Sequence, residues 1–291
     1  ESAFYPLFAL ALWLVVRALR RPSIVSQILV LGAAFLSFET RPQGAVIVPA
    51  FVVSAILVVL VDGLAADSDQ RLRTAGGVAA RFLPTWVVAV GAAVVVWRYQ
   101  DITGRPLSSA LGAYSITLES GTAYAPKIIA SWSALHVAET ALWLGVLPLF
   151  AFLLMLGASL RRGASRDQRV FVIASLPLAV AMTVVVSAFL IFSNVGRIEE
   201  RNLFYIGPIF LVALCWWLSR PRDEPLPRWG SVVLVASCAL PLAIPYDRFL
   251  NQSAVSDTFG LFLPWAVSLR LGDPVLTTVA VFVACVAAAT V

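Results

Sequence analysis

Long, continuous apolar runs constrain this chain more than any other feature of its 291 residues. Within the runs, apolar residues do not alternate with polar ones, so the pattern does not predict half-buried strands. A bilayer core about 30 Å thick is crossed by roughly 20 apolar residues in helical form, and only helices or closed barrels satisfy their backbone hydrogen bonds there. The sequence therefore predicts an all-α fold, a polytopic bundle of transmembrane helices.

We expect about nine transmembrane helices, accompanied by short interfacial helices on the outer face. Together they form a single transmembrane domain over residues 1–291. The expected helices cover residues 4–19, 24–37, 45–61, 82–97, 135–160, 170–192, 203–218, 231–244 and 274–291.

Composition excludes several classes of protein. Apolar residues make up 60% of the chain and charged residues 13%, whereas soluble globular proteins contain roughly 45–50% and about 25%. So few charges cannot cover the surface of a water-soluble enzyme, a nucleic-acid-binding domain or a disordered chain. The basic residues lie in short clusters between apolar runs, where membrane topology accounts for them. We therefore expect membrane lipids, and no nucleic acid, as partners.

Charge is distributed unevenly between alternate turns of the expected bundle. If the turn with Arg17, Arg20 and Arg21 is cytoplasmic, alternation also places residues 62–81, 161–169 and 219–230 in the cytoplasm. These four segments carry 13 of the 21 basic and 6 of the 16 acidic residues, a net charge of +7, while the other side has a net charge of −2. By the positive-inside rule, the turn 40–44 and the loops 98–134 and 246–265 then face outward.

No metal or cofactor site is expected. Cys215, Cys238 and Cys285 lie in apolar runs without C-x-x-C spacing, which predicts neither a disulfide framework nor a zinc site. His136, the only histidine, lies three residues before Glu139, near the start of the fifth expected helix. One histidine cannot form a zinc site, so we interpret it as a polar residue at the membrane interface, and the sequence does not indicate a divalent metal.

Two polar clusters lie at predicted outer helix ends. Glu1 precedes the first helix, where the helix dipole favours a carboxylate, either as a cap or as a reactive group. In the next outer turn, Glu39 and Arg41 are held at the membrane surface, where a guanidinium can make two parallel hydrogen bonds to a phosphate. An internal Glu39–Arg41 pair, or a contact with lipid headgroups, is the alternative. Glu1 and Glu39 are the candidates for a catalytic carboxylate.

A third cluster follows the sixth expected helix. If this segment is helical, Arg197 and Arg201 are i,i+4 neighbours, and like charges at that spacing repel unless an anion lies between them. Glu200 or a bound phosphate can supply the negative charge, and Glu199 is a second neighbouring carboxylate. We expect Arg197, Arg201 and Tyr205 to bind such a phosphate. A salt-bridge cluster within the segment is the alternative.

Three motifs follow one another in a distinctive order. They are Glu1-Ser2-Ala3-Phe4-Tyr5-Pro6-Leu7-Phe8, Thr40-Arg41-Pro42-Gln43-Gly44 and Glu200-Arg201-Asn202-Leu203-Phe204-Tyr205-Ile206-Gly207-Pro208. This order resembles that of the GT-C membrane glycosyltransferases, over roughly residues 1–220. Within that family, the chain is similar to bacterial relatives of the dolichyl-phosphate-mannose-dependent O-mannosyltransferases and to the aminoarabinose transferases.

The resemblance implies an enzyme of the bacterial plasma membrane that acts on the extracytoplasmic face. Such enzymes move a sugar, with inversion, from a polyprenyl-phosphate donor to an acceptor glycan, lipid or protein. A carboxylate in the family's first external loop is the general base, and basic residues at outer helix ends hold the leaving phosphate. Arg41 and Arg201 match the arginine motifs, and Glu1 matches an acidic position. Because the family's first helix and that external loop lie upstream of Glu1, we expect this chain to be a fragment that lacks them.

A transporter or flippase for a lipid-linked or anionic substrate is the alternative function. Transporters place ionisable residues near the membrane midplane, whereas here the ionisable residues gather at predicted outer helix ends. A non-catalytic membrane scaffold would leave the Arg and Glu clusters at three outer turns unexplained. The sequence therefore favours the glycosyltransferase.

Overall fold

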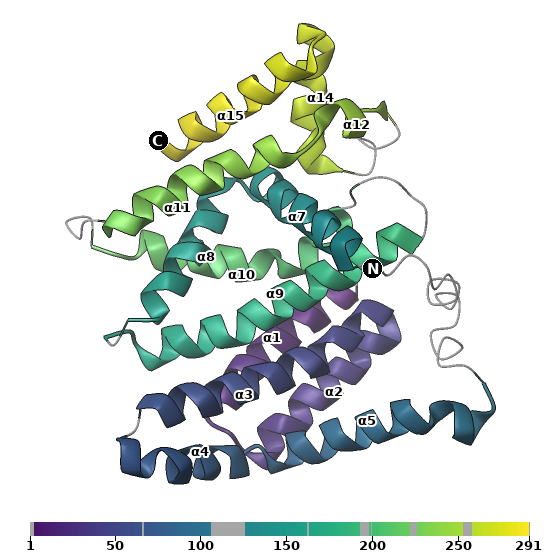
Figure 1. Ribbon diagram of the computed structural model, residues 1–291, viewed down its shortest axis with the longest axis vertical. Helices are drawn as coiled ribbons and strands as arrows, with labels where there is room; N and C mark the ends of the chain where they lie inside the picture. The colour runs from purple at the N-terminus through teal and green to yellow at the C-terminus, as the bar shows by residue number, and fades with distance from the viewer. Residues whose placement is uncertain are drawn as a thin grey trace. The chain divides into compact units, whose positions relative to one another are not determined.

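The computed structural model describes residues 3–65, 67–105, 126–161, 163–192, 198, 200–221, 226–252 and 258–290 (Figure 1). Within these ranges every regular element is an α-helix or a short 3-10 helix, and no strand occurs. The predicted all-α fold is therefore confirmed. The chain divides into two compact units, while the expectation of a single transmembrane domain stays a prediction.

The first unit consists of the described residues of Glu1–Gly121 and Gly163–Val185. In it α1 packs along α2, α3 packs against α4, and the 3-10 helix η1 runs directly into α3. The elements are α1 (Phe4–Arg20), α2 (Ile24–Thr40), η1 (Pro42–Val46), α3 (Ile47–Ala65), η2 (Ser68–Gln70), α4 (Arg71–Ala80), α5 (Leu83–Thr103) and the first part of α9 (Arg166–Phe192).

The turn between α1 and α2 follows from three residues. Pro22 disfavours helical geometry at the residue before it, and Arg21 accordingly leaves the helix with φ −138° and ψ 80°. The hydroxyl of Ser23 then accepts a hydrogen bond from the backbone N–H of Ser26, whose own hydroxyl accepts from the N–H of Ser23. This reciprocal cap starts α2 directly after the turn.

A buried amide joins α2 to the start of α5. Gln27 is completely buried, and its Oε1 accepts hydrogen bonds from the hydroxyl of Thr85 at 2.6 Å and from its N–H at 3.2 Å. Its Nε2 donates to the carbonyl of Arg81 at 2.8 Å. Because each polar atom of the amide has a partner, its burial is not penalised, and the network fixes Arg81 beside α2.

A proline in α9 is compensated by a serine on α3. Pro177 has no N–H, so the carbonyl of Ile173 four residues earlier loses its intrahelical donor. The hydroxyl of Ser54 lies 2.8 Å from that carbonyl and 2.8 Å from the carbonyl of Ala50 in its own helix. The Ser54 hydroxyl thus satisfies a backbone group that proline would otherwise orphan in an apolar interior.

The second unit consists of the described residues of Thr122–Arg162 and Val186–Val291. In it α8 packs against α10 and α11, and α14 packs against α7 and α15. The elements are α7 (Pro126–Trp143), α8 (Val146–Ser159), the end of α9, η4 (Glu200–Asn202), η5 (Phe204–Ile206), α10 (Gly207–Leu218), α11 (Arg228–Ala239), η6 (Leu240–Ala243), α12 (Tyr246–Phe249), α14 (Phe259–Leu271) and α15 (Pro274–Thr290).

Two expectations about helices in this unit are wrong. The single helix expected over 135–160 is broken into α7 and α8, which meet at 117°, because Gly145 adopts φ 81°, a value that side-chain-bearing residues rarely reach. The outer loop expected over 246–265 contains α12 and most of α14. The polar residues and Pro264 of this stretch favoured the prediction of a loop, but the structure has a short apolar helix there. The N-terminus of that helix is stabilised by a residue from a distant part of the chain.

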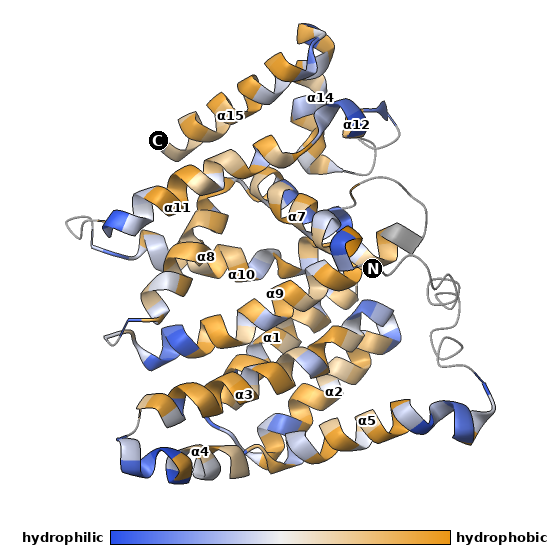
Figure 2. Ribbon diagram, in the orientation of Figure 1, coloured by the Kyte–Doolittle hydropathy of each residue, from blue (hydrophilic) through white to orange (hydrophobic). Residues whose placement is uncertain are grey.

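Several helices are long and apolar enough to cross a membrane. Among the described residues these are Pro42–Ala65 and Arg166–Leu190, and the bent pairs α4 with α5 and α7 with α8 raise the number to four if each pair forms one span. Figure 2 shows hydrophobic residues along the helix centres and hydrophilic ones gathered mainly near helix ends. Val87, Val90 and Val94 are exposed on α5, whose only buried residue is Thr85. The expected count of nine spans stays a prediction.

Replacing Ser54 by Ala should destabilise the protein by about 1–3 kcal/mol, because the carbonyl of Ile173 loses the hydroxyl that donates to it. In a Pro177→Ala background the new N–H can serve that carbonyl, so the same substitution should cost less. Unfolding in detergent micelles measures both. Ser175→Ala is the matched control, since its buried hydroxyl finds no partner among the described residues. An equal cost of Ser54→Ala in both backgrounds would contradict this account.

The predicted orientation can be tested with single cysteines at Thr40 and Ser165, both exposed, on a background without the three native cysteines. An impermeant maleimide should label position 40 in intact cells and position 165 only after permeabilisation. The reverse pattern would overturn the orientation.

Candidate functional site

The N-terminus of α14 is capped by a carboxylate from a distant part of the chain. Glu200, in η4, accepts hydrogen bonds from the backbone N–H groups of Phe259 and Gly260, the latter at 2.7 Å. A helix leaves its first N–H groups without intrahelical partners, and the side chain of Thr258 at the N-cap position makes no capping hydrogen bond to them. The carboxylate also faces the positive end of the helix dipole. Glu200 thus fastens η4 to α14.

Gly260 makes this contact possible. A Cβ atom at this position would lie 2.8 Å from Oε2 of Glu200 and 3.2 Å from Cβ of Trp143. Any larger side chain would therefore displace either the carboxylate or α7. The three elements η4, α7 and α14 consequently meet at one point.

Helix α7 brings a second carboxylate to this point. Glu139 is completely buried, and its carboxyl group interacts electrostatically with that of Glu200. Both oxygens of Glu139, and the indole N–H of Trp143 one turn later, have no hydrogen-bond partner among the described residues. Burying such groups without partners costs free energy. We therefore interpret these side chains as functional residues and not only as packing residues.

His136 precedes Glu139 by one turn on the same side of α7. Its Nδ1 lies 2.8 Å from the carbonyl oxygen of Trp132. Because a carbonyl oxygen can only accept, Nδ1 carries a proton, and in the neutral ring Nε2 is an acceptor. Nε2 is buried and has no partner within the described ranges. We call His136, Glu139, Trp143 and Glu200 the buried acid cluster.

One carboxyl group of the buried acid cluster has a pKa close to neutral pH. Burial raises the pKa of Glu200 to about 7, although its two backbone hydrogen bonds act in the opposite direction. A carboxyl group with such a pKa exchanges its proton close to neutral pH, which suits acid–base chemistry or a pH-dependent contact.

The segment after Glu200 directs its side chains to different sides. Arg201 is exposed, whereas Asn202 and Tyr205 are buried. Phe204 packs edge-on against Trp143, with ring centroids 5.0 Å apart. Of the site residues predicted from sequence, the structure therefore brings Glu200, Arg201 and Tyr205 together in one short segment, with Arg201 at its surface.

Two other predicted residues lie at the end of α2, in the first unit. Glu39 is exposed in the last helical turn, and Arg41 is half-buried at the C-cap. The turn is tight because the N–H of Gly44 donates to the carbonyl of Arg41 at 2.8 Å. A Cβ atom on Gly44 would lie 2.5 Å from the backbone N of Phe38, so glycine is required for this close approach.

The remaining predicted residues, Glu1, Arg197 and Glu199, lie outside the described residues. Arg41 belongs to the first unit and Arg201 to the second. Their convergence on one phosphate stays a prediction.

Sequence reasoning missed Glu139 and gave His136 only an interfacial role. Both are completely buried. A signal for them exists, because two ionisable residues three positions apart share one side of a helix, and ionisable residues inside apolar helices usually have a function. What the sequence lacked was any sign that Glu200, in a distant segment, meets Glu139.

The described residues contain no group of three His, Cys, Asp or Glu side chains placed to hold a metal ion. The chain matches no known protein family, no curated protein and no solved structure.

The burial of Glu200 should make stability depend on pH, because burial favours the protonated carboxyl group. Since the folded-state pKa of Glu200 is raised to about 7, the stabilisation from holding the proton is fully present below the ordinary carboxyl pKa and is lost as pH rises through 7, by up to about 3 kcal/mol. Glu200→Gln should flatten this dependence in thermal unfolding between pH 5 and 8. Glu39→Gln, at an exposed position, is the control, and an unchanged pH profile in Glu200→Gln would refute the assignment.

Proposed function

We propose that the protein is a GT-C-type membrane glycosyltransferase that moves a sugar from a polyprenyl phosphate to an acceptor glycan, lipid or protein on the extracytoplasmic face. The observation that supports this most is the position of Arg201 directly after Glu200. The buried carboxylate is fixed on α14, and the neighbouring guanidinium remains at the surface. A fixed, exposed guanidinium is suited to bind a phosphate.

The chemistry of the transfer explains why such an arginine is useful. When the bond between sugar and phosphate breaks, negative charge develops on the leaving phosphate. A guanidinium already in position stabilises that charge, most strongly in the transition state. In this proposal Arg201 binds the phosphate, assisted by Arg41, Arg197 and Tyr205, and Glu200 is a positioning residue that keeps the segment attached to α14.

The acceptor hydroxyl must lose its proton as it attacks the sugar. Glu1 and Glu39 are the proposed candidates for this general base, because each carboxylate lies at a predicted outer helix end. Glu39 is exposed on the last turn of α2, so a substrate can reach it. Glu199 is proposed only as a neighbouring carboxylate.

A specific observation favours transport as a second candidate function. Glu139 is a buried carboxylate without a hydrogen-bond partner among the described residues, on a helix that can contribute to a membrane span. Ionisable residues in this environment occur in the proton and ion pathways of transporters. A transporter or flippase for a lipid-linked anionic substrate would use Glu139, whereas the glycosyltransferase would depend on Arg201.

In the complete protein, Arg201→Ala should weaken binding of a polyprenyl-phosphate sugar by about 1.5–3 kcal/mol, because a charge-assisted hydrogen bond is lost. Arg201→Lys should also weaken it, since an ammonium cannot make two parallel bonds. Equilibrium binding of the donor in detergent measures both. Arg270→Ala, an exposed arginine on α14, should have no effect, and equal affinity for all variants would defeat the proposal.

Reconstituted vesicles separate the two functions. A glycosyltransferase forms a sugar–acceptor product, and Arg201→Ala reduces it. A transporter moves the intact donor between leaflets without product, and Glu139→Gln stops that movement.

A further inference from the structure

The first unit contains a cavity of about 1060 Å³ beside the turn between α1 and α2. Its most unusual feature is that, among the described residues, five arginines and no acidic residue line it. The lining residues that matter here are Arg17, Arg20, Arg21, Arg81 and Arg166, together with Trp13, Val25, Ser26 and Leu29.

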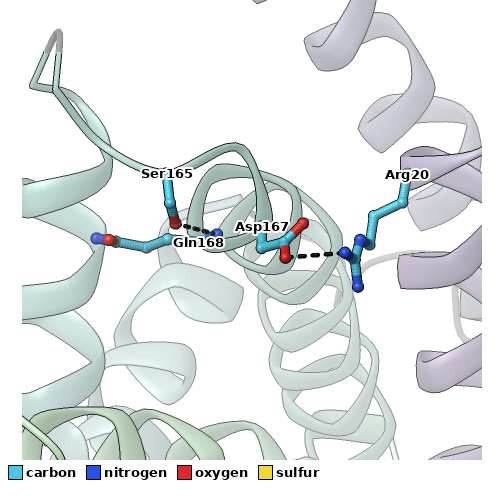
Figure 3. Close-up of polar contacts among 4 residues, drawn as sticks. All are labelled: Arg20, Ser165, Asp167 and Gln168. Atoms are coloured by element: carbon cyan, nitrogen blue, oxygen red, sulfur yellow. Dashed lines mark hydrogen bonds and ion pairs between the residues drawn. The ribbon is translucent and has the colours of Figure 1, made fainter.

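Only some of these arginines are neutralised. Arg20 pairs with Asp167 at 2.8 Å, as Figure 3 shows at the start of α9, and Arg166 lies 3.9 Å from Asp62. Arg21 and Arg81 have no ion-pair partner among the described residues. The cavity therefore has an excess of positive charge that an anion would balance.

The arrangement is built into the fold. Pro22 and the cap formed by Ser23 and Ser26 fix Arg21 at the turn, and the hydrogen bond from Gln27 to the carbonyl of Arg81 fixes that residue beside α2. The N-terminus of α2 lies at the same place and adds the positive end of its dipole.

The cavity is amphiphilic along the two helices. Trp13, Arg17 and Arg20 follow one another on one face of α1, with the tryptophan farthest from the turn, and the guanidinium of Arg17 lies 5.4 Å from the Trp13 ring centre. On α2, Val25 and Leu29 continue away from the turn in the same way. Trp13 is 54% and Val25 67% exposed. The cationic end therefore continues into an apolar wall.

We propose that this cavity binds the phosphate group of an anionic phospholipid, with its acyl chains along Trp13, Val25 and Leu29. A phosphate matches the guanidinium groups in charge and geometry, and the apolar wall favours a lipid over a free phosphate ion. The site lies at the end that the positive-inside rule assigns to the cytoplasm, where anionic lipids are abundant. It is separate from the proposed transferase chemistry.

Binding to the purified protein in uncharged detergent tests the proposal, with dioctanoyl phosphatidylglycerol, dioctanoyl phosphatidylcholine and inorganic phosphate as probes. Phosphatidylglycerol should bind saturably, and phosphatidylcholine more weakly. Arg81→Gln should lower the affinity for phosphatidylglycerol about tenfold. Arg73→Gln removes the same charge from exposed α4 outside the cavity and should leave the affinity unchanged. Arg81→Lys keeps the charge and should retain most of the affinity, which would show that the loss in Arg81→Gln does not come from misfolding.

Two further results decide the source of the phosphate. Trp13→Ala should weaken phosphatidylglycerol binding and leave any binding of inorganic phosphate unchanged. If inorganic phosphate binds as tightly as phosphatidylglycerol and Trp13→Ala alters neither, the ligand is a soluble phosphate compound and the lipid proposal fails. Equal loss in Arg81→Gln and Arg73→Gln would mean that the arginines act only as a diffuse charge, which also overturns the proposal.

Discussion

Backbone N–H and carbonyl groups that are shielded from water have to find partners within the protein, and the main features of this structure follow from how they do so. The Ser54 hydroxyl serves the carbonyl that Pro177 orphans in α9. Gln27 bonds the backbone on both sides of the α4–α5 bend. Glu200 serves the first N–H groups of α14. In each case one polar side chain from another element completes a helix, so these side chains also fix which helices lie together.

The need to satisfy buried backbone groups also places a carboxyl group with an unusual pKa in the second unit. Glu200 has to be buried to reach α14, and that burial raises its pKa to about 7. It also brings Glu200 close to Glu139, which finds no hydrogen-bond partner in the described part of the chain. The residue that caps α14 is therefore also an acid with an unusual pKa, and the exposed Arg201 follows it in the same 3-10 helix.

In the first unit, arginines mark both ends of α2. Arg21 lies before its first residue and Arg41 after its last, so the length of the helix, about 25 Å, separates them. This spacing is close to the thickness of a bilayer core. The proposed lipid site at Arg21 and the proposed assisting role of Arg41 therefore lie at opposite ends of one helix, so the two proposals are physically compatible.

The sequence by itself determined the all-α class and most helix positions, because apolar runs and capping residues such as Ser23 act locally. It also located Arg41, Glu200 and Arg201 at helix ends. It did not reveal the break at Gly145, helix α14 or the buried acid cluster. The last two depend on contacts between residues far apart in the chain: α14 is capped by Glu200, and Glu139 is buried beside that same carboxyl group. Hydropathy describes each residue with its neighbours in sequence, whereas the cost of burying a charge depends on which distant groups surround it, and only the tertiary structure decides that.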